Sequence, residues 1–162
     1  MHNHHPIGIT SVGAYTPPNL LTNFDLEKIV DTSDEWIRTR SGISSRHIAD
    51  ANTATSDLAA AAGRKALAIA GITPEELDLI IVATITPDMI LPSTACIVQR
   101  LLGASRAAAF DLSAACTGFI YALNVASAQI TTGMFRNALV LGDVRVIPQA
   151  LDEIYAELLK YL

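Results

Sequence analysis

The sequence predicts an α/β fold with a mainly parallel sheet and helices layered against it. Short apolar runs rich in β-branched residues stand at 77–86 and 137–142, and such runs are typical of strands that are buried on both faces. Helical segments with recognisable end signals lie between these runs. Because strand and helix alternate along the chain, we expect crossover helices that join parallel strands.

Composition narrows the class of protein. The chain has 162 residues, of which 51% are hydrophobic, and a formal net charge of −5. This length suits one folded domain with a sizeable core, and the acidic balance argues against nucleic acid as the main partner. No apolar run reaches the ~20 residues of a membrane-spanning helix, and residues 1–10 lack a signal-peptide pattern. We therefore expect a cytoplasmic protein without a nucleic-acid or membrane partner.

The first third of the chain carries three sets of end signals. Residues 7–15 alternate apolar and small side chains before two prolines, which predicts a strand ending in a turn. A helix is expected to follow over 22–31, with Thr22 or Asn23 as its cap. The next helix has Ser33 as its cap, acidic residues in its first turn and Gly42 as its stop.

The remaining elements follow the same logic. Their signals are alanine-rich or apolar helical spacing, serine or threonine caps and terminal glycines. The predicted elements are an alanine-rich helix over about 56–71, a capped turn at 72–77, a strand over 77–86, a helix over 92–103 with Ser93 or Thr94 as its cap, a strand over 107–114, a helix over 117–133 and a strand over 137–142.

Cys116 is the candidate nucleophile. It stands where the strand over 107–114 gives way to the helix over 117–133, and reactive groups of parallel sheets gather at the carboxyl ends of strands. The unpaired amides and the dipole of a helix N-terminus favour a thiolate there. However, a free cysteine is often a small core residue, and composition alone leaves the two interpretations equal. Cys96 lies inside an apolar helical run, so a structural role is expected for it.

Trp36 and Arg40 form a second candidate site. Their spacing places them on one face of the predicted helix, where an indole and a guanidinium can sandwich a purine and meet a phosphate. Taken alone, a partly exposed tryptophan beside an arginine is more often surface packing. Asp34 and Glu35 are interpreted as helix-start charges, and His47 as a surface or hydrogen-bonded residue in a short strand.

Three longer motifs carry a family resemblance. The segments "DTSDEWIRTRSGISSRHIA", "PSTACIVQRLLG" and "FDLSAACTGFIYAL" together resemble β-ketoacyl-acyl-carrier-protein synthase III, and the similarity runs over about 7–142. The resemblance implies one half of a thiolase-like fold, a homodimer, and no cofactor beyond a CoA thioester that is itself a substrate. It also implies acyl transfer from a short acyl-CoA such as acetyl-CoA, and then condensation with malonyl-acyl carrier protein.

The resemblance also implies roles for individual residues. Cys116 matches the cysteine that becomes acylated. Trp36 and Arg40 match residues that hold the CoA adenine, and Thr32 matches another residue of that site. Leu91 matches a position that reaches across the dimer to line the acyl pocket of the partner.

The sequence departs from the family pattern after residue 142. The family's second half carries a catalytic histidine and asparagine in motifs like His-Gln-Ala-Asn and Gly-Asn-Thr, and neither motif occurs in the printed residues. We therefore expect a thiolase-like N-terminal domain over 1–142 and an atypical helical tail over 143–162. The tail's apolar stripe predicts an amphipathic helix and suits a truncated or frameshifted product, a designed covering helix or a docking helix. The stripe comprises Ile147, Leu151, Ile154, Tyr155, Leu158 and Leu162.

Two hypotheses about function follow. In the first, the chain derives from a condensing enzyme and is inactive in condensation by itself, because it lacks the histidine and asparagine that stabilise the enolate. In the second, it is a non-catalytic α/β module that retains a CoA-binding or dimerisation surface.

Overall fold

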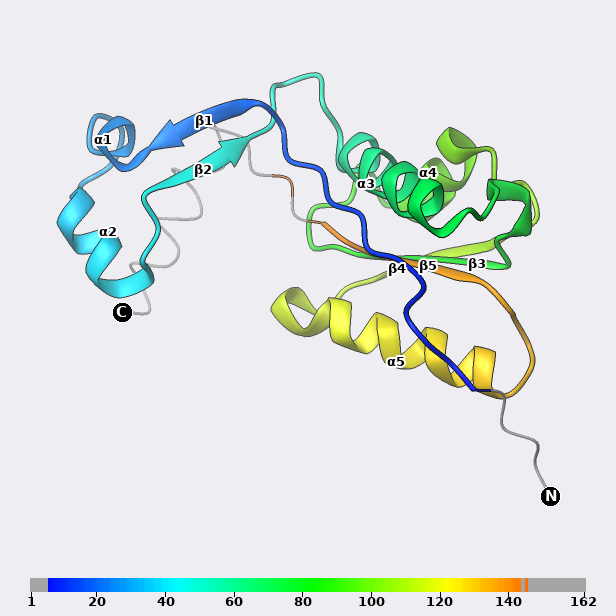
Figure 1. Ribbon diagram of the computed structural model, residues 1–162. Coiled ribbons are helices and arrows are strands. Elements are labelled where there is room, and N and C mark those ends of the chain that lie inside the picture. The colour runs from blue at the N-terminus through cyan, green and yellow to red at the C-terminus, as the bar shows by residue number, and fades with distance from the viewer. Residues whose placement is uncertain (1–5, 144, 146–162) are drawn as a thin grey trace. The chain divides into compact units, whose positions relative to one another are not determined.

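The computed structural model describes residues 6–143 and residue 145 (Figure 1). The chain divides into two compact units, of which unit 1 comprises residues 1–15 and 54–144 and unit 2 comprises residues 16–53 and 145–162. The helical tail predicted over 143–162 lies outside the described residues, apart from Asp143 and Arg145, and stays a prediction.

Unit 1 is built on a three-stranded parallel sheet in the order β4-β3-β5. The central strand β3 (Leu79–Ala83) pairs with β4 (Ala108–Leu112) on one side and with β5 (Ala138–Gly142) on the other. All five residues of β3 are buried, as expected for a strand covered on both faces. The predicted parallel sheet is therefore confirmed.

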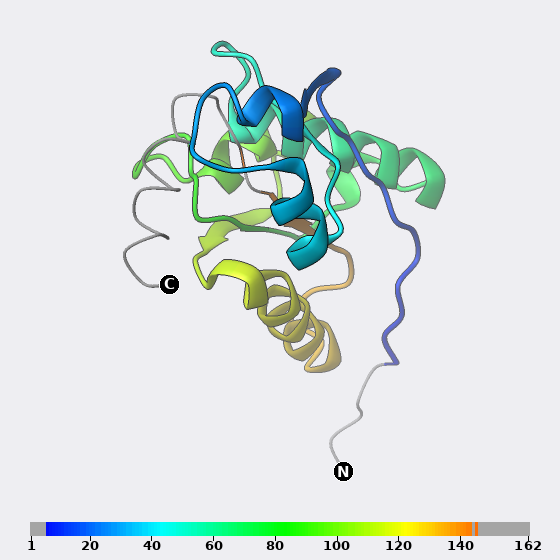
Figure 2. The ribbon, with the colours of Figure 1, turned by 90° about the vertical axis from the view of Figure 1, so that its left-hand side faces the viewer.

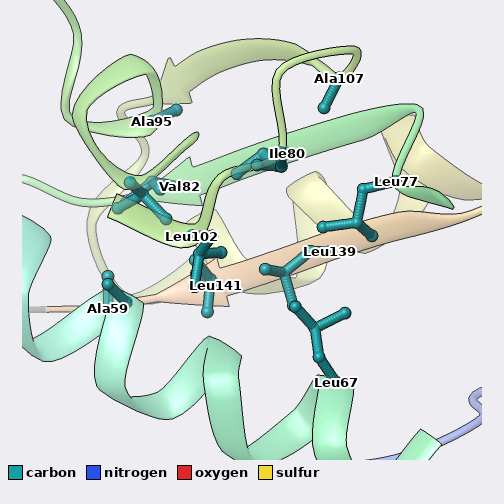
Figure 3. Packing of buried hydrophobic residues seen from close by; sticks show 13 residues of the cluster. Ala59, Leu67, Leu77, Ile80, Val82, Ala95, Leu102, Ala107, Leu139 and Leu141 are labelled. Atoms are coloured by element: carbon teal, nitrogen blue, oxygen red, sulfur yellow. The ribbon is translucent and has the colours of Figure 1, made fainter. Parts of the chain in front are cut away.

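Helices cover both faces of this sheet (Figures 1 and 2). Helices α3 (Thr55–Ala70) and α4 (Thr94–Leu102) pack on one face, and α5 (Gly118–Thr131) packs on the other. Figure 3 shows Leu67 of α3 and Leu139 of β5 side by side in the larger core cluster. Alternate residues of β3 serve the two faces, because Ile80 and Val82 join the α3–α4 cluster while Leu79 and Ile81 join the α5 cluster.

The predicted end signals of these helices are confirmed. The Ser93 hydroxyl accepts a hydrogen bond from the Cys96 amide and caps α4, and Gly103 ends that helix with a φ of 81°. Gly71 ends α3 with a φ of 66°. The capped turn at Pro74–Glu76 is a single 3-10 turn, η1.

The strand predicted over 7–15 is wrong. This segment is not assigned to either sheet, and two of its hydrogen bonds instead attach it to α3. The Ser11 hydroxyl donates to the Ala66 carbonyl oxygen at 2.8 Å, and the Lys65 ammonium donates to the Ala14 carbonyl oxygen at 3.0 Å. The segment is therefore attached to a helix by hydrogen bonds rather than paired with a strand, and its apolar residues Ile7, Ile9 and Val12 stay exposed.

Over residues 16–53, unit 2 contains a two-stranded antiparallel ribbon and two short helices. Strand β1 (Asn19–Thr22), which the sequence did not predict, pairs with β2 (Ser45–Ile48). Helix α1 is shorter than the predicted 22–31 and spans Asn23–Leu26 after a Thr22 cap. Helix α2 (Asp34–Ser41) has the predicted Ser33 cap and Gly42 stop. Leu26 and Ile37 join the two helices in a small apolar cluster.

Substitution of Gly13 tests how closely residues 7–15 pack against α3. A Cβ at Gly13 would lie 2.5 Å from the Ala62 carbonyl oxygen and 2.5 Å from the Ala66 nitrogen, so Gly13→Ala must displace the segment. We expect a loss of about 1–3 kcal/mol in the free energy of unfolding, measured by urea denaturation. Gly8→Ala is the matched control, because a Cβ there meets nothing within 4 Å; equal losses in the two variants would contradict this packing.

The capping box of α1 predicts a specific pH dependence. Hydrogen bonds, first of all from the Thr22 hydroxyl, lower the pKa of Asp25 from 3.8 to about 2. Because the folded-state pKa is depressed, the stabilisation is present above pH 3.8 and is lost as the pH falls toward 2. Thr22→Val should move the pKa of Asp25 back up toward its ordinary value, as NMR titration of the carboxyl carbon will measure. If the titration midpoint of Asp25 is unchanged in Thr22→Val, the lowered pKa is due to Lys28 rather than to Thr22.

Candidate active site

Cys116 lies in a tight turn between β4 and α5. The turn η2 (Ala115–Thr117) follows β4 and runs directly into α5, so the predicted strand-to-helix position is confirmed. Ala115 has a φ of 45°, a left-handed conformation that is uncommon for a residue with a Cβ. The Thr117 amide and hydroxyl both bond to the Ala114 carbonyl oxygen, at 3.2 and 2.9 Å. These bonds hold a strained turn that leaves Cys116 exposed.

The Cys116 side of unit 1 is hollowed into a largely apolar cleft of about 940 Å³. Its lining comes from residues 7–13, from α3 and α5, and from all of β5. Cys116 and Phe119 line it near the carboxyl end of β5, and Ile130 and Arg136 line it near the other end of α5. Its size is in the range of small-molecule sites. The cleft, which we name the Cys116 cleft, gives an apolar group access to the thiol.

Asp111 fixes the strand that leads to Cys116. Its two carboxylate oxygens accept hydrogen bonds from the backbone amides of Thr94 and Ala95, at 2.8 and 2.7 Å. A carboxylate at the N-terminus of a helix satisfies otherwise unpaired amides. Asp111 thus ties β4 to the start of α4. Sequence reasoning missed this residue, although an aspartate within an apolar strand was a visible signal.

Cys96 occupies a different environment from Cys116. Its sulfur is half-buried, accepts a hydrogen bond from the Ser93 hydroxyl at 3.2 Å and lies 3.7 Å from the Ala109 carbonyl oxygen. These contacts agree with the structural role expected from the sequence.

Trp36 and Arg40 are stacked on α2 in unit 2. The guanidinium carbon of Arg40 lies 4.6 Å from the centroid of the Trp36 ring, which is a cation–π geometry. Trp36 is still 40% exposed, so the indole has surface left for a ligand. The Ser33 hydroxyl caps this helix by accepting a hydrogen bond from the Trp36 amide at 3.1 Å.

The buried side-chain amide of Asn23 connects α2 to neighbouring residues. The side chain of Asn23 is fully buried, and its Nδ2 donates to the Asp34 carboxylate and to the Ile43 carbonyl oxygen, both at 2.8 Å. Its Oδ1 accepts a hydrogen bond from the Arg46 guanidinium at 2.6 Å, and Arg46 also donates to the Leu21 carbonyl oxygen at 3.2 Å. Sequence reasoning considered Asn23 only as a cap of α1, and Thr22 has that role.

Thr32 lies two positions before Asp34, the first residue of α2. Its hydroxyl oxygen is buried and has no hydrogen-bond partner among the described residues. A buried hydroxyl without a partner costs free energy, so a hydrogen bond to this oxygen would stabilise the segment before α2.

Leu91 belongs to an anchored loop between β3 and α4 in unit 1. The Asp88 carboxylate accepts a hydrogen bond from the Ser56 amide at 2.9 Å, and the Asp88 amide donates to the Thr94 hydroxyl at 3.1 Å. Beyond this anchor, Ile90 and Leu91 are 90% and 83% exposed. The loop therefore presents an apolar tip, which suits the predicted contact with a partner chain but does not test it.

Other chemistry is sparse in the described part of the chain. His47 is in β2, as expected, and its Nδ1 lies 2.6 Å from the Pro17 carbonyl oxygen. Residues 6–143 and 145 contain no group of three or more His, Cys, Asp or Glu that could hold a metal ion. None of the helices described is both long enough and apolar enough to cross a bilayer.

The predicted site residues thus fall into two groups. Cys116 and Leu91 belong to unit 1, whereas Thr32, Trp36 and Arg40 belong to unit 2. Within unit 2, the three residues stand on α2 or just before its cap.

Comparison with known proteins agrees with this architecture. Residues 110–152 match the family described as 3-Oxoacyl-[acyl-carrier-protein (ACP)] synthase III. A β-ketoacyl-[acyl-carrier-protein] synthase III from Caldanaerobacter subterraneus subsp. tengcongensis is 62% identical over 135 residues, which are 83% of this chain and 41% of that protein. The chain thus spans about two fifths of the length of the curated relatives it matches.

Solved structures give the same result. The crystal structure of 3-oxoacyl-[acyl-carrier-protein] synthase III from Aquifex aeolicus VF5 matches with a TM-score of 0.80 and 57% identity, over 83% of this chain and 43% of that chain. The priming β-ketosynthase of the R1128 polyketide pathway matches with a TM-score of 0.76 and 39% identity, over 79% of this chain and 38% of that one. By sequence and by thiolase-like fold, the chain is therefore similar to the N-terminal portion of proteins named β-ketoacyl-[acyl-carrier-protein] synthase III.

Proposed function

We propose that this chain carries the acyl-accepting part of a condensing acyltransferase of fatty-acid chain initiation, with Cys116 as the nucleophile. The observation that carries the proposal is the position of Cys116, exposed in a strained turn and lining a cleft of about 940 Å³. The relatives named β-ketoacyl-[acyl-carrier-protein] synthase III support the reaction class.

The proposed step is thioester exchange. The Cys116 thiolate attacks the carbonyl carbon of acetyl-CoA or another short acyl-CoA, and a tetrahedral oxyanion forms. The bond between that carbon and the CoA sulfur then breaks, CoA leaves as a thiolate and takes up a proton, and the acyl group stays on Cys116. Because Cys116 stands just before α5, the positive end of that helix's dipole favours negative charge on the oxyanion.

The proposed recognition of CoA uses α2. The exposed face of Trp36 suits the adenine ring and the Arg40 guanidinium suits a phosphate. The buried Thr32 hydroxyl, which has no partner among the described residues, gives the same site a hydrogen-bonding group.

The complete reaction needs a second half-reaction. Malonyl-acyl carrier protein loses carbon dioxide, and the resulting enolate attacks the acyl carbon on Cys116, which releases the thiolate. The enolate requires electrostatic stabilisation, and the printed residues contain neither of the family motifs that would supply it. We therefore propose that these 162 residues accept an acyl group but do not complete the condensation by themselves.

The proposed homodimer would use apolar surface of unit 1. Ile90 and Leu91 project from the anchored loop, and Phe119, Ile120 and Tyr121 of α5 are 43%, 56% and 51% exposed. Contiguous exposed apolar surface is typical of interaction sites. A second copy of the chain would cover this surface, and Leu91 would then enter the partner.

Acylation of Cys116 is the first prediction of this proposal. Incubation of the 162-residue chain with acetyl-CoA should add one acetyl group to the tryptic peptide that contains Cys116 and none to that of Cys96, as measured by mass spectrometry. Cys116→Ala should abolish the modification, whereas Cys96→Ala should not. With malonyl-acyl carrier protein added, no ketoacyl product should form. If Cys116 is not acetylated, the hypothesis of a non-catalytic module is favoured. If a ketoacyl product forms, the proposal that the 162 residues cannot complete the condensation is wrong.

Recognition of adenine is the second prediction. Trp36→Ala should slow the acylation of Cys116 by acetyl-CoA about tenfold, since stacking of a base on an aromatic ring contributes about 1–3 kcal/mol. S-acetylpantetheine has the same thioester without the adenine, so its rate should be unchanged. Equal slowing of both thioesters, measured under pseudo-first-order conditions, would contradict an adenine site at Trp36.

A further inference from the structure

Asn23 joins α2 to the rest of unit 2 through one side chain. Its Nδ2 donates to Asp34, the first residue of α2, and to the carbonyl oxygen of Ile43, which follows the stop of the helix at Gly42. We propose that Asn23 is a positioning residue, whose carboxamide fixes both ends of α2 and so sets the orientation in which Trp36 and Arg40 meet CoA. This role rests on the adenine site proposed above.

The packing of α2 explains why polar bonds decide its orientation. Ile37 is the single buried residue of this helix, and it contacts the small apolar cluster around Leu26. One buried side chain allows a short helix to rotate and tilt about it, and the hydrogen bond from the Asp34 amide to the Glu27 carboxylate, at 2.7 Å, restrains only the first turn. The two hydrogen bonds from Asn23 act at opposite ends of the helix, so together they remove that freedom.

Only a carboxamide satisfies all of these partners. Asp34 and the Ile43 carbonyl oxygen need donors, while the Arg46 guanidinium needs an acceptor, and an amide offers both from one planar group. A carboxylate at position 23 would keep the Arg46 bond but would lose both donors and repel Asp34. A leucine at position 23 would accept no hydrogen bond, so the Arg46 guanidinium would lose its acceptor at a buried position.

Trp36 is the single tryptophan of the sequence, so the fluorescence of the protein's indole comes from α2 alone. Quenching of this fluorescence by CoA therefore measures binding at α2. In the wild-type chain, CoA should quench Trp36 fluorescence with a saturable dependence on concentration, and pantetheine should not. Asn23→Asp should weaken CoA binding about tenfold, the size expected for buried donor groups that lose their partners. Its rate of Cys116 acylation by S-acetylpantetheine should be unchanged, because this thioester has no adenine.

Two further variants separate positioning from general damage. Gln99→Glu is the matched control, because the Gln99 amide also anchors a helix by donating to the Ala107 carbonyl oxygen at 2.7 Å, and CoA affinity should be unchanged in it. The double variant Asn23→Asp with Asp34→Asn reverses the direction of one hydrogen bond, since Nδ2 of the new asparagine can donate to the new carboxylate. It should recover part of the lost CoA affinity.

Each outcome is decisive. If CoA does not quench the wild-type chain, the proposed adenine site fails, whatever Asn23 does. If the wild type responds and Asn23→Asp binds CoA equally well, Asn23 has no positioning role. Slowed acylation by both thioesters, or no rescue in the double variant, would also overturn the proposal in favour of a structural role. Should Asn23→Asp not fold, Asp34→Asn removes the charge from the same bond and should weaken CoA binding in the same selective way.

Discussion

The complete burial of β3 is the constraint on which unit 1 depends. Every residue of this strand is covered, which is possible only because the strand has a parallel neighbour on each side and helices on both faces. Parallel pairing requires crossover helices, and the shared strand direction brings the ends of β3, β4 and β5 to one edge of the sheet. The turn of Cys116 is attached at that edge. The position of Cys116 and the stability of the core therefore both follow from the parallel pairing of β3.

The described residues of unit 2 bury few large apolar side chains. Its apolar cluster has Leu26 and Ile37 as buried members, and a network of side-chain hydrogen bonds around Asn23 and Arg46 supplies the remaining order. Buried polar groups in such a network specify one arrangement when all of them are paired. In unit 2 this network fixes the arrangement around α2, the helix that carries Trp36 and Arg40.

The sequence predicted most of unit 1 because its signals are local. The periods of apolar residues, the Ser93 cap and the glycine stops depend on near neighbours, and the structure agrees with them. Residues 7–15 show the limit: an alternating pattern indicates an extended chain but not its partner, and this segment attaches to α3. Strand β1 was missed for the same reason, since its partner β2 is distant in the chain. Candidate site residues were found by motif, whereas Asn23 and Asp111 act through hydrogen bonds to partners distant in the chain, which the sequence does not identify even where the residue itself stands out.

The backbone conformation of Ala115 adds a free-energy cost to the turn that carries Cys116. A residue with a Cβ at a φ of 45° raises the free energy of the folded state by about 1–3 kcal/mol. Glycine would remove that cost, but it would also widen the range of backbone angles open to the residue before the sulfur. Alanine is thus a compromise in which some stability is given up so that the thiol is held in a narrow range of directions.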